Sequence, residues 1–127
     1  MTFMKTIVPA AALFAALTAF APAPARFHAH LVKADPAVND TIATVPKTVR
    51  LWFSEPVEVA LSRMQIVRVG GDTLRTTALR REGPATTAAA DLTVPATAPG
   101  TYVVSYHVVA RDGHPSSGEY RFVVRGE

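Results

Sequence analysis

A two-residue period of large apolar side chains constrains the fold of this chain more than any other feature. Residues 101–110 show it most clearly, because in an extended strand one face would carry Tyr102, Val104, Tyr106 and Val108, and the other Val103, Ser105, His107 and Val109. The same two-residue period recurs in residues 48–54 and 120–124. Such a period, rich in β-branched and aromatic residues, is typical of strands, and no 12-residue stretch after residue 27 shows a helical stripe. The chain is therefore predicted to be all-β.

Short strands separated by turns predict the architecture. Weaker strand patterns cover residues 29–33, 64–69, 74–79 and 90–94, with turn-forming pairs such as Gly70-Gly71 between them. About seven short strands at this spacing are typical of a single Greek-key β-sandwich or barrel, of cupredoxin- or immunoglobulin-like form.

The predicted core draws on strands along the whole chain. It comprises Leu31, Val49, Leu51, Phe53, Ile66, Val104, Tyr106, Phe122 and Val124. A core of this size is adequate for a domain of about 100 residues. Residues 85–90 are rich in alanine and could form one turn of helix, although they lack large apolar side chains to anchor it.

Composition excludes several classes of protein. The chain has 127 residues, which is the length of one domain, and 49% of them are apolar. It has no cysteine, which excludes disulfides, thiolate metal sites and iron–sulfur clusters. Of the 13 Lys and Arg residues only Lys5 and Arg26 precede residue 28, so the rest of the chain carries 11 basic and 10 acidic residues. No basic patch stands out, and nucleic-acid binding is excluded on that ground.

The first 27 residues are typical of a secretory signal peptide. Lys5 precedes an apolar run at 7–21, and a stretch of Ala and Pro follows. An uncleaved membrane anchor is the alternative, but the run is shorter than the roughly 20 residues that a span needs. Cleavage after Ala25 fits the small-residue rule, whereas cleavage after Phe27 would free the amine of His28. An exported chain without cysteine fits the bacterial periplasm.

Histidines occur at the two ends of the remaining chain. His28 and His30 lie at its start, and Asp112 and His114 lie near its end. Residues two apart in an extended segment point to the same side, so each pair could present its side chains to one ion. An N-terminal histidine can chelate a metal through its amine and its ring. Together with Asp112 and His114 it would offer three nitrogens and one oxygen, a set that suits tetragonal Cu(II).

Other interpretations of these histidines stay open. If cleavage follows Ala25, His28 becomes the third residue, and it could wrap Cu(II) together with the amine and two backbone amides. The early histidines could also be exposed residues of a frayed terminus, and Asp112 could belong to an ordinary turn. His107 takes the opposite face of its strand from Tyr106 and is interpreted as a surface or structural histidine.

Two groups of motifs resemble the CopC-type periplasmic copper-binding proteins. The first group consists of His-Ala-His-Leu-Val at 28–32, Asp-Pro-Ala at 35–37 and Leu-Trp-Phe-Ser-Glu-Pro at 51–56. The second consists of Pro-Gly-Thr-Tyr at 99–102, Tyr-His-Val-Val at 106–109, Asp-Gly-His-Pro at 112–115 and Gly118. The resemblance implies one Cu(II)-binding β-domain over residues 28–127, with His28, Asp112 and His114 as ligands. His30 is an additional ligand candidate, and Glu55 is a candidate acceptor next to the ligands.

The resemblance also implies a function in copper resistance or homeostasis. The protein would sequester periplasmic Cu(II) and hand it to a CopD-like inner-membrane transporter, and it would not be an enzyme. Met64 is the one methionine after residue 27, so no Cu(I) methionine site is expected. We expect a monomer. The alternatives are a copper enzyme that cleaves polysaccharides oxidatively from a histidine brace, and a metal-free immunoglobulin-like interaction module.

Overall fold

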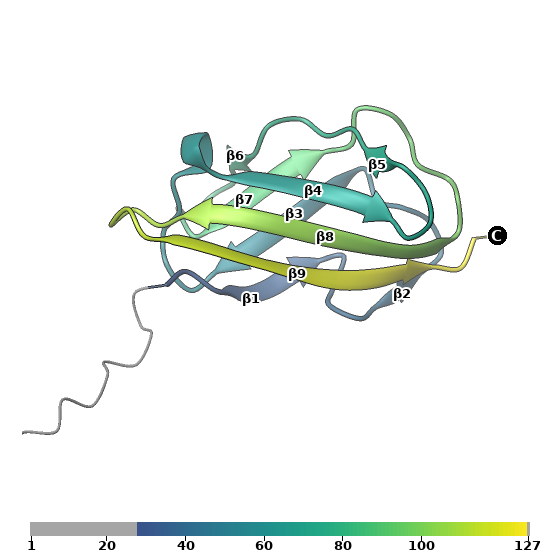
Figure 1. Ribbon diagram of the computed structural model, residues 1–127, viewed down its shortest axis with the longest axis horizontal. Coiled ribbons are helices and arrows are strands. Elements are labelled where there is room, and N and C mark those ends of the chain that lie inside the picture. Colours follow the sequence, from purple (N-terminus) through teal and green to yellow (C-terminus); the bar gives the residue numbers. More distant parts are fainter. Residues whose placement is uncertain (1–27, 127) are drawn as a thin grey trace, which may run out of the picture.

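Nine strands in residues 28–126, the part of the chain that this computed structural model describes, form two sheets packed face to face (Figure 1). The four-stranded sheet has the order β1 (Leu31–Asp35), β3 (Thr48–Phe53), β7 (Thr87–Asp91) and β6 (Arg80–Arg81). The five-stranded sheet has the order β2 (Thr41–Ile42), β9 (Pro115–Val124), β8 (Gly100–Val109), β4 (Arg63–Arg68) and β5 (Thr73–Leu74). The predicted all-β sandwich is confirmed. It has more strands than expected because β2, β5 and β6 are only two residues long and leave little pattern in the sequence.

The hairpin of β8 and β9 is the longest element of the fold. The two strands pair antiparallel over their full length, from Gly100 opposite Val124 to Val109 opposite Pro115. The predicted alternation in β8 is confirmed, since Tyr102, Val104 and Val108 are buried between the sheets. Because both strands are ten residues long, the hairpin carries its connecting turn to one end of the sandwich.

The core lies between the two sheets, as predicted. Seven of the predicted core residues are buried, namely Val49, Leu51, Phe53, Ile66, Val104, Phe122 and Val124. Leu31 and Tyr106 are half-buried and pack against the edge of this core. Tyr102 was not predicted as a core residue but is fully buried. Its ring stacks on Phe122 with centroids 5.3 Å apart, and its hydroxyl donates to the Ala98 carbonyl, so that its polar atom is satisfied.

The helical turn considered for residues 85–90 is wrong, because most of this segment belongs to strand β7 between β3 and β6. Alanine favours helices in isolation, but tertiary packing decides here. Ala89 lies opposite Arg50 on one side and Arg80 on the other, and its small side chain leaves room for both guanidinium groups. The predicted strands at 74–79 and 90–94 are also misplaced, since β5 ends at Leu74, β6 begins at Arg80 and β7 ends at Asp91.

Charged side chains form a network on the outer face of the four-stranded sheet. Arg50 Nε contacts Glu82 Oε1 at 2.6 Å, and Arg80 contacts both Glu82, at 3.3 Å, and Asp91, at 3.1 Å. Thr48 also donates to Asp91, at 2.7 Å. The hydrogen bond from Arg50 holds the pKa of Glu82 below its usual value, and the bonds from Thr48 and Arg80 do the same for the pKa of Asp91.

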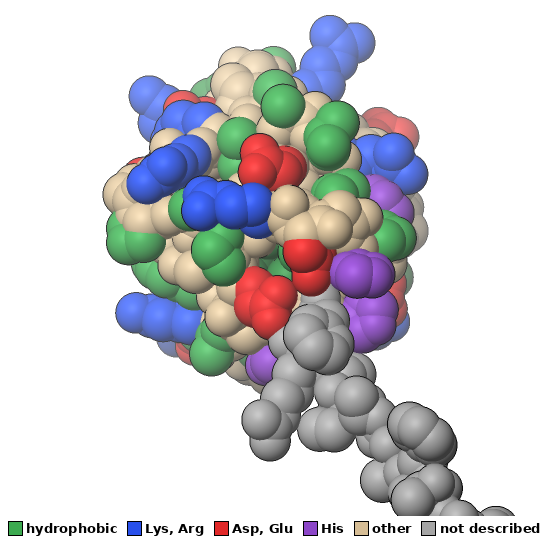
Figure 2. All heavy atoms as spheres, turned by 90° about the vertical axis from the view of Figure 1, so that its left-hand side faces the viewer, with side chains coloured by type: hydrophobic (Ala, Val, Ile, Leu, Met, Phe, Trp, Pro, Cys, Tyr) green, Lys and Arg blue, Asp and Glu red, His purple; other side chains and the backbone are tan. Residues whose placement is uncertain are grey.

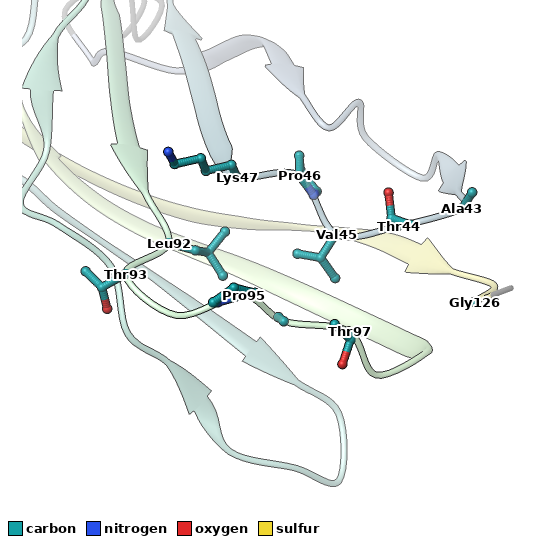
Figure 3. A pocket seen from close by; sticks show the side chains of 11 residues that line it. Ala43, Thr44, Val45, Pro46, Lys47, Leu92, Thr93, Pro95, Thr97 and Gly126 are labelled. Carbon is teal, nitrogen blue, oxygen red and sulfur yellow. The ribbon is translucent and has the colours of Figure 1, made fainter.

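A groove opens at the end of the sandwich where β8 begins and β9 ends (Figure 3). Its volume is about 750 Å³, and residues 43–47 and 92–97 form most of its lining. Figure 3 shows Val45 and Leu92 on facing walls, and a backbone hydrogen bond of 2.8 Å from Leu92 to Lys47 joins the two segments. The lining contains no histidine and no carboxylate, so none of the predicted metal ligands lies in this groove.

A single short 3₁₀ helix, η1 (Val59–Leu61), interrupts the strands in the described part of the chain. No helix among residues 28–126 is long and apolar enough to cross a membrane. The predicted signal peptide, with its two candidate cleavage positions, lies outside the described residues.

Candidate metal centre

The turn between β8 and β9 brings Asp112 and His114 into contact. Asp112 Oδ1 accepts a hydrogen bond of 3.0 Å from the backbone N–H of His114, and Asp112 Oδ2 lies 3.1 Å from His114 Nδ1. The turn is closed by hydrogen bonds from Gly113 N to Ala110 O and from Ala110 N to His114 O. Gly113 has a φ of +91°, a conformation that favours glycine. The sequence predicts these two side chains on one side of an extended segment; they do lie together, but in a turn, where the hydrogen bonds of the turn and its glycine bring them into contact.

The start of the described chain lies against this turn. The ring of His28 is 5.9 Å from the ring of His114, centroid to centroid, in an edge-to-face arrangement. Ala29 is fully buried, so it anchors the segment that carries the exposed His28. Figure 2 looks onto this end of the sandwich and shows histidine and acidic side chains gathered side by side. The two ends of the histidine pattern therefore meet at one end of the fold.

His30 is hydrogen-bonded to Ser54. The backbone N–H of His30 donates to Ser54 Oγ at 3.1 Å, and Ser54 Oγ also lies 3.1 Å from His30 Nδ1. A third hydrogen bond, of 2.9 Å, runs from Ser54 N to His30 O. Within residues 28–126 no group of three or more His, Cys, Asp or Glu side chains is arranged to hold a metal by itself. His28, His114 and Asp112 are instead linked by two pairwise contacts.

The electrostatics of the turn keep Asp112 ionised. Hydrogen bonds from the backbone and the side chain of His114 lower the pKa of Asp112. The side chains of His114 and Asp112 are 58% and 40% exposed, so an ion from solution can reach both. An ionised carboxylate next to an accessible imidazole suits a divalent transition metal.

A segment after β3 supports the turn from the other sheet. Glu58 N donates to Val109 O, Arg111 N donates to Pro56 O, and Val57 forms an isolated bridge with Ala110. The side chains of Arg111 and Glu58 add an ion pair of 3.8 Å. Sequence reasoning missed this support, although Pro56 is the last residue of the quoted Leu-Trp-Phe-Ser-Glu-Pro motif and Val57 and Glu58 follow it directly.

Glu55 does not take part in the contacts of the turn. It is half-buried after β3, and its carboxylate forms no ion pair with a histidine in the described part of the chain. The suggestion that it supports a metal ligand therefore stays a prediction.

Three further residues, His107, Trp52 and Met64, contact the strands around them. His107 lies on the face of β8 opposite to Tyr106, as predicted, and its Nδ1 is 2.9 Å from Ser117 Oγ on β9. Trp52 packs beneath Lys33, whose Nζ is 4.7 Å from the ring centroid. Met64 is half-buried on β4 and packs against the core.

Comparison with known proteins places the chain in a family. The CopC domain model matches residues 31–125, so the chain belongs to the CopC family. Protein YobA from Escherichia coli K12 is 36% identical over 101 residues, which are 77% of this chain and 79% of YobA. The crystal structure of CopC from Methylosinus trichosporium OB3b has a TM-score of 0.71 and 33% identity, and the match covers 79% of this chain and 96% of that one. The copper transport protein CutJ from Bacillus subtilis is 28% identical over 83% of this chain but only 19% of CutJ.

Proposed function

We propose that this protein binds Cu(II) in the periplasm and sequesters or delivers it in copper resistance or homeostasis. Membership of the CopC family supports a copper-related function, and so does the likeness to CutJ, which is named as a copper transport protein. The observation that carries the proposal is the approach of His28 to His114, at 5.9 Å between ring centroids, across 86 positions of sequence (114 − 28).

The proposed ligands are the amine and ring of His28, the carboxylate of Asp112 and the ring of His114. Two ligands at adjacent corners of a metal, each bonded at about 2.0 Å, lie about 2.8 Å apart. The 3.1 Å between Asp112 Oδ2 and His114 Nδ1 is close to that separation. A cation could therefore replace their direct contact with little movement of the turn. Three nitrogens and one carboxylate oxygen favour the oxidised ion.

The amine ligand requires a processed N-terminus. We propose that residues 1–27 are a signal peptide that is removed after Phe27, which leaves His28 as the first residue in the periplasm. Cleavage after Ala25 would leave Arg26 in front and remove the chelate of amine and ring. His30 stays an additional ligand candidate through its Nε2, because Nδ1 is engaged with Ser54.

Residues 28–127 contain no cluster of methionine side chains that could bind Cu(I). Met64 is its one methionine, and that side chain packs against the core. Binding should therefore favour Cu(II) over Cu(I). A CopD-like inner-membrane copper transporter is the proposed recipient, and the protein is proposed to act as a monomer.

We propose a binding function and no catalysis. Oxidative cleavage of polysaccharides at a histidine brace needs an open coordination position on the copper. Asp112, in contact with His114, would occupy a position and stabilise the oxidised ion. Release of oxidised oligosaccharides in the presence of a reductant would favour the enzymatic alternative.

Copper titration of the exported protein tests the proposal. The protein is purified from the periplasm, its N-terminal mass is measured, and Cu(II) is titrated against a competing chelator. We expect one tightly bound ion and an affinity about 100-fold lower in His114→Ala, since a direct ligand is lost. His107→Ala is the matched control, because its partner is Ser117 on the flank of the hairpin. Equal affinities of His114→Ala and the wild type would contradict the proposal and favour the metal-free module.

A further inference from the structure

Gly118 makes room for the ring of Tyr106. The two residues lie directly opposite each other in the hairpin of β8 and β9. A methyl group at position 118 would collide with the hydroxyl and the adjoining ring carbon of Tyr106. Gly118 is not among the glycines with positive φ, so its backbone does not itself require glycine. Glycine is needed at position 118 because the ring of Tyr106 fills the space that any other side chain would occupy.

From its position over Gly118, the side chain of Tyr106 contacts the four-stranded sheet. Its ring lies 5.4 Å from that of Phe53, centroid to centroid, at an interplanar angle of 73°. Phe53 is the last residue of β3 and pairs with Leu31, the first residue of β1. The hydroxyl of Tyr106 contacts the backbone of Leu31, and burial raises the pKa of Tyr106, which keeps this hydroxyl neutral. Tyr106 therefore connects the long hairpin to the strand that begins three residues after His28.

We propose that Tyr106, whose ring packs over Gly118, is a positioning residue. It would set the distance between His28 and the turn that carries Asp112 and His114. His28 lies three residues before the start of β1, and β8 ends next to the turn that carries Asp112 and His114. Tyr106 belongs to β8, its ring contacts Phe53 on β3, and its hydroxyl reaches the backbone of Leu31 on β1. This inference rests on the proposed function, because it concerns the geometry of the same copper site.

The other two tyrosines of the hairpin show that this arrangement is specific. The Tyr102 hydroxyl donates to Ala98 at the groove end of the sandwich. The Tyr120 hydroxyl is buried and has no hydrogen-bond partner among the described residues. Of these three side chains, Tyr106 is the one whose hydroxyl is hydrogen-bonded to the backbone at the start of β1. Tyr120→Phe is therefore a matched control, since it removes a hydroxyl of the same hairpin that has no hydrogen-bond partner among the described residues.

The test compares copper binding in Tyr106→Phe, Gly118→Ala, Tyr120→Phe and His114→Ala, each purified with the processed N-terminus of the wild type. The measurements are Cu(II) affinity by chelator competition, the copper hyperfine splitting in electron paramagnetic resonance, and thermal unfolding without metal. Val124→Ala is added as a control for stability, because it leaves a cavity in the core at the opposite end of the hairpin, where Val124 pairs with Gly100. A role in stability alone would lower the melting temperature and leave the resonance spectrum unchanged.

We expect about tenfold weaker Cu(II) binding and an altered hyperfine splitting in Gly118→Ala, and about three- to fivefold weaker binding in Tyr106→Phe. Tyr120→Phe and Val124→Ala should keep the wild-type affinity and spectrum. Wild-type binding in both Tyr106→Phe and Gly118→Ala, with loss in His114→Ala, would overturn this inference and leave the proposed function standing. Unchanged binding in His114→Ala would overturn both. Should Gly118→Ala not fold, Tyr106→Phe decides alone.

Discussion

Ser54 binds His30 through three hydrogen bonds, two to its backbone and one to its ring. Ser54 directly follows strand β3, whose last residue, Phe53, pairs with Leu31 on β1. The contact therefore extends the pairing of the two strands beyond the end of the sheet and fixes the chain two residues after His28. These bonds hold the segment together with Ala29, which is fully buried in the core.

Replacement of Ser54 by alanine should loosen the segment that carries His28. We expect faster amide exchange at His30 and Cu(II) binding about three- to tenfold weaker, because the ion must then order a freer chain. Hydrogen exchange and chelator competition measure the two effects. Ser105→Ala, on the outer face of β8, is the control and should change neither. Slow amide exchange at His30 in Ser54→Ala would show that the segment is ordered by other contacts.

The position of the amine should matter as much as the ring of His28. One alanine inserted in front of His28 moves the amine to a different residue while every described side chain is kept. We expect a loss of Cu(II) affinity of about 100-fold and a change in the resonance spectrum, since the chelate of amine and ring is broken. Mass spectrometry of both exported proteins confirms their first residues. Wild-type affinity in the extended protein would exclude the amine as a ligand.

The affinity for Cu(II) should decrease as the pH falls. Amine and imidazole groups must lose a proton before they bind a metal, so protons compete with Cu(II) as the pH falls. We expect affinity to be high at pH 8 and to fall steeply below about pH 6, where imidazoles become protonated. Titrations across this range at constant ionic strength give the slope. The same affinity at pH 5 and pH 8 would contradict a ligand set rich in nitrogen.

Acid should destabilise the metal-free fold through Glu82 and Asp91. Both have lowered pKa values in the folded protein, so the stability they contribute is present above their ordinary values of 4.5 and 3.8 and is lost as the pH falls further. Arg50→Gln removes the main partner of Glu82. We expect its melting temperature to be a few degrees lower at pH 7, and the difference from the wild type to shrink towards pH 3. Arg63→Gln is the control, as Arg63 forms no ion pair in the described residues; an equal decrease there would exclude the network as the cause.

The long strands could be predicted from the sequence because their side chains alternate between a face packed in the core and a face turned towards solvent. β8 shows this pattern from Tyr102 to Val108, and the structure has the expected residues inside. β7 could not be predicted in the same way. Its residues Thr87 to Ala90 are buried on both faces, so no alternation appears, and alanine by itself favours helix. Its pairing depends on β3 and β6, which lie far away in the sequence.

The candidate ligands could be chosen from the sequence by residue type and spacing, but their surroundings could not. Nothing in the local pattern of Ser54 indicates that it binds His30, because that contact depends on how β1 and β3 pair. The fit of Tyr106 over Gly118 likewise depends on the register of two strands, and a one-residue shift would remove it. Such contacts follow from the tertiary fold, which single-sequence patterns do not contain.

The turn that bears Asp112 and His114 is closed by peptide groups and glycine geometry, with the core packed beneath it. An arriving ion would therefore meet a loop that already has its shape, and a departing ion would leave nothing to refold. The exchange rate would then be governed by the breaking of bonds at the metal and not by slow rearrangement of the chain. Under the proposed function, the protein would bind and release copper repeatedly without a change in the outer surface that it presents to a recipient.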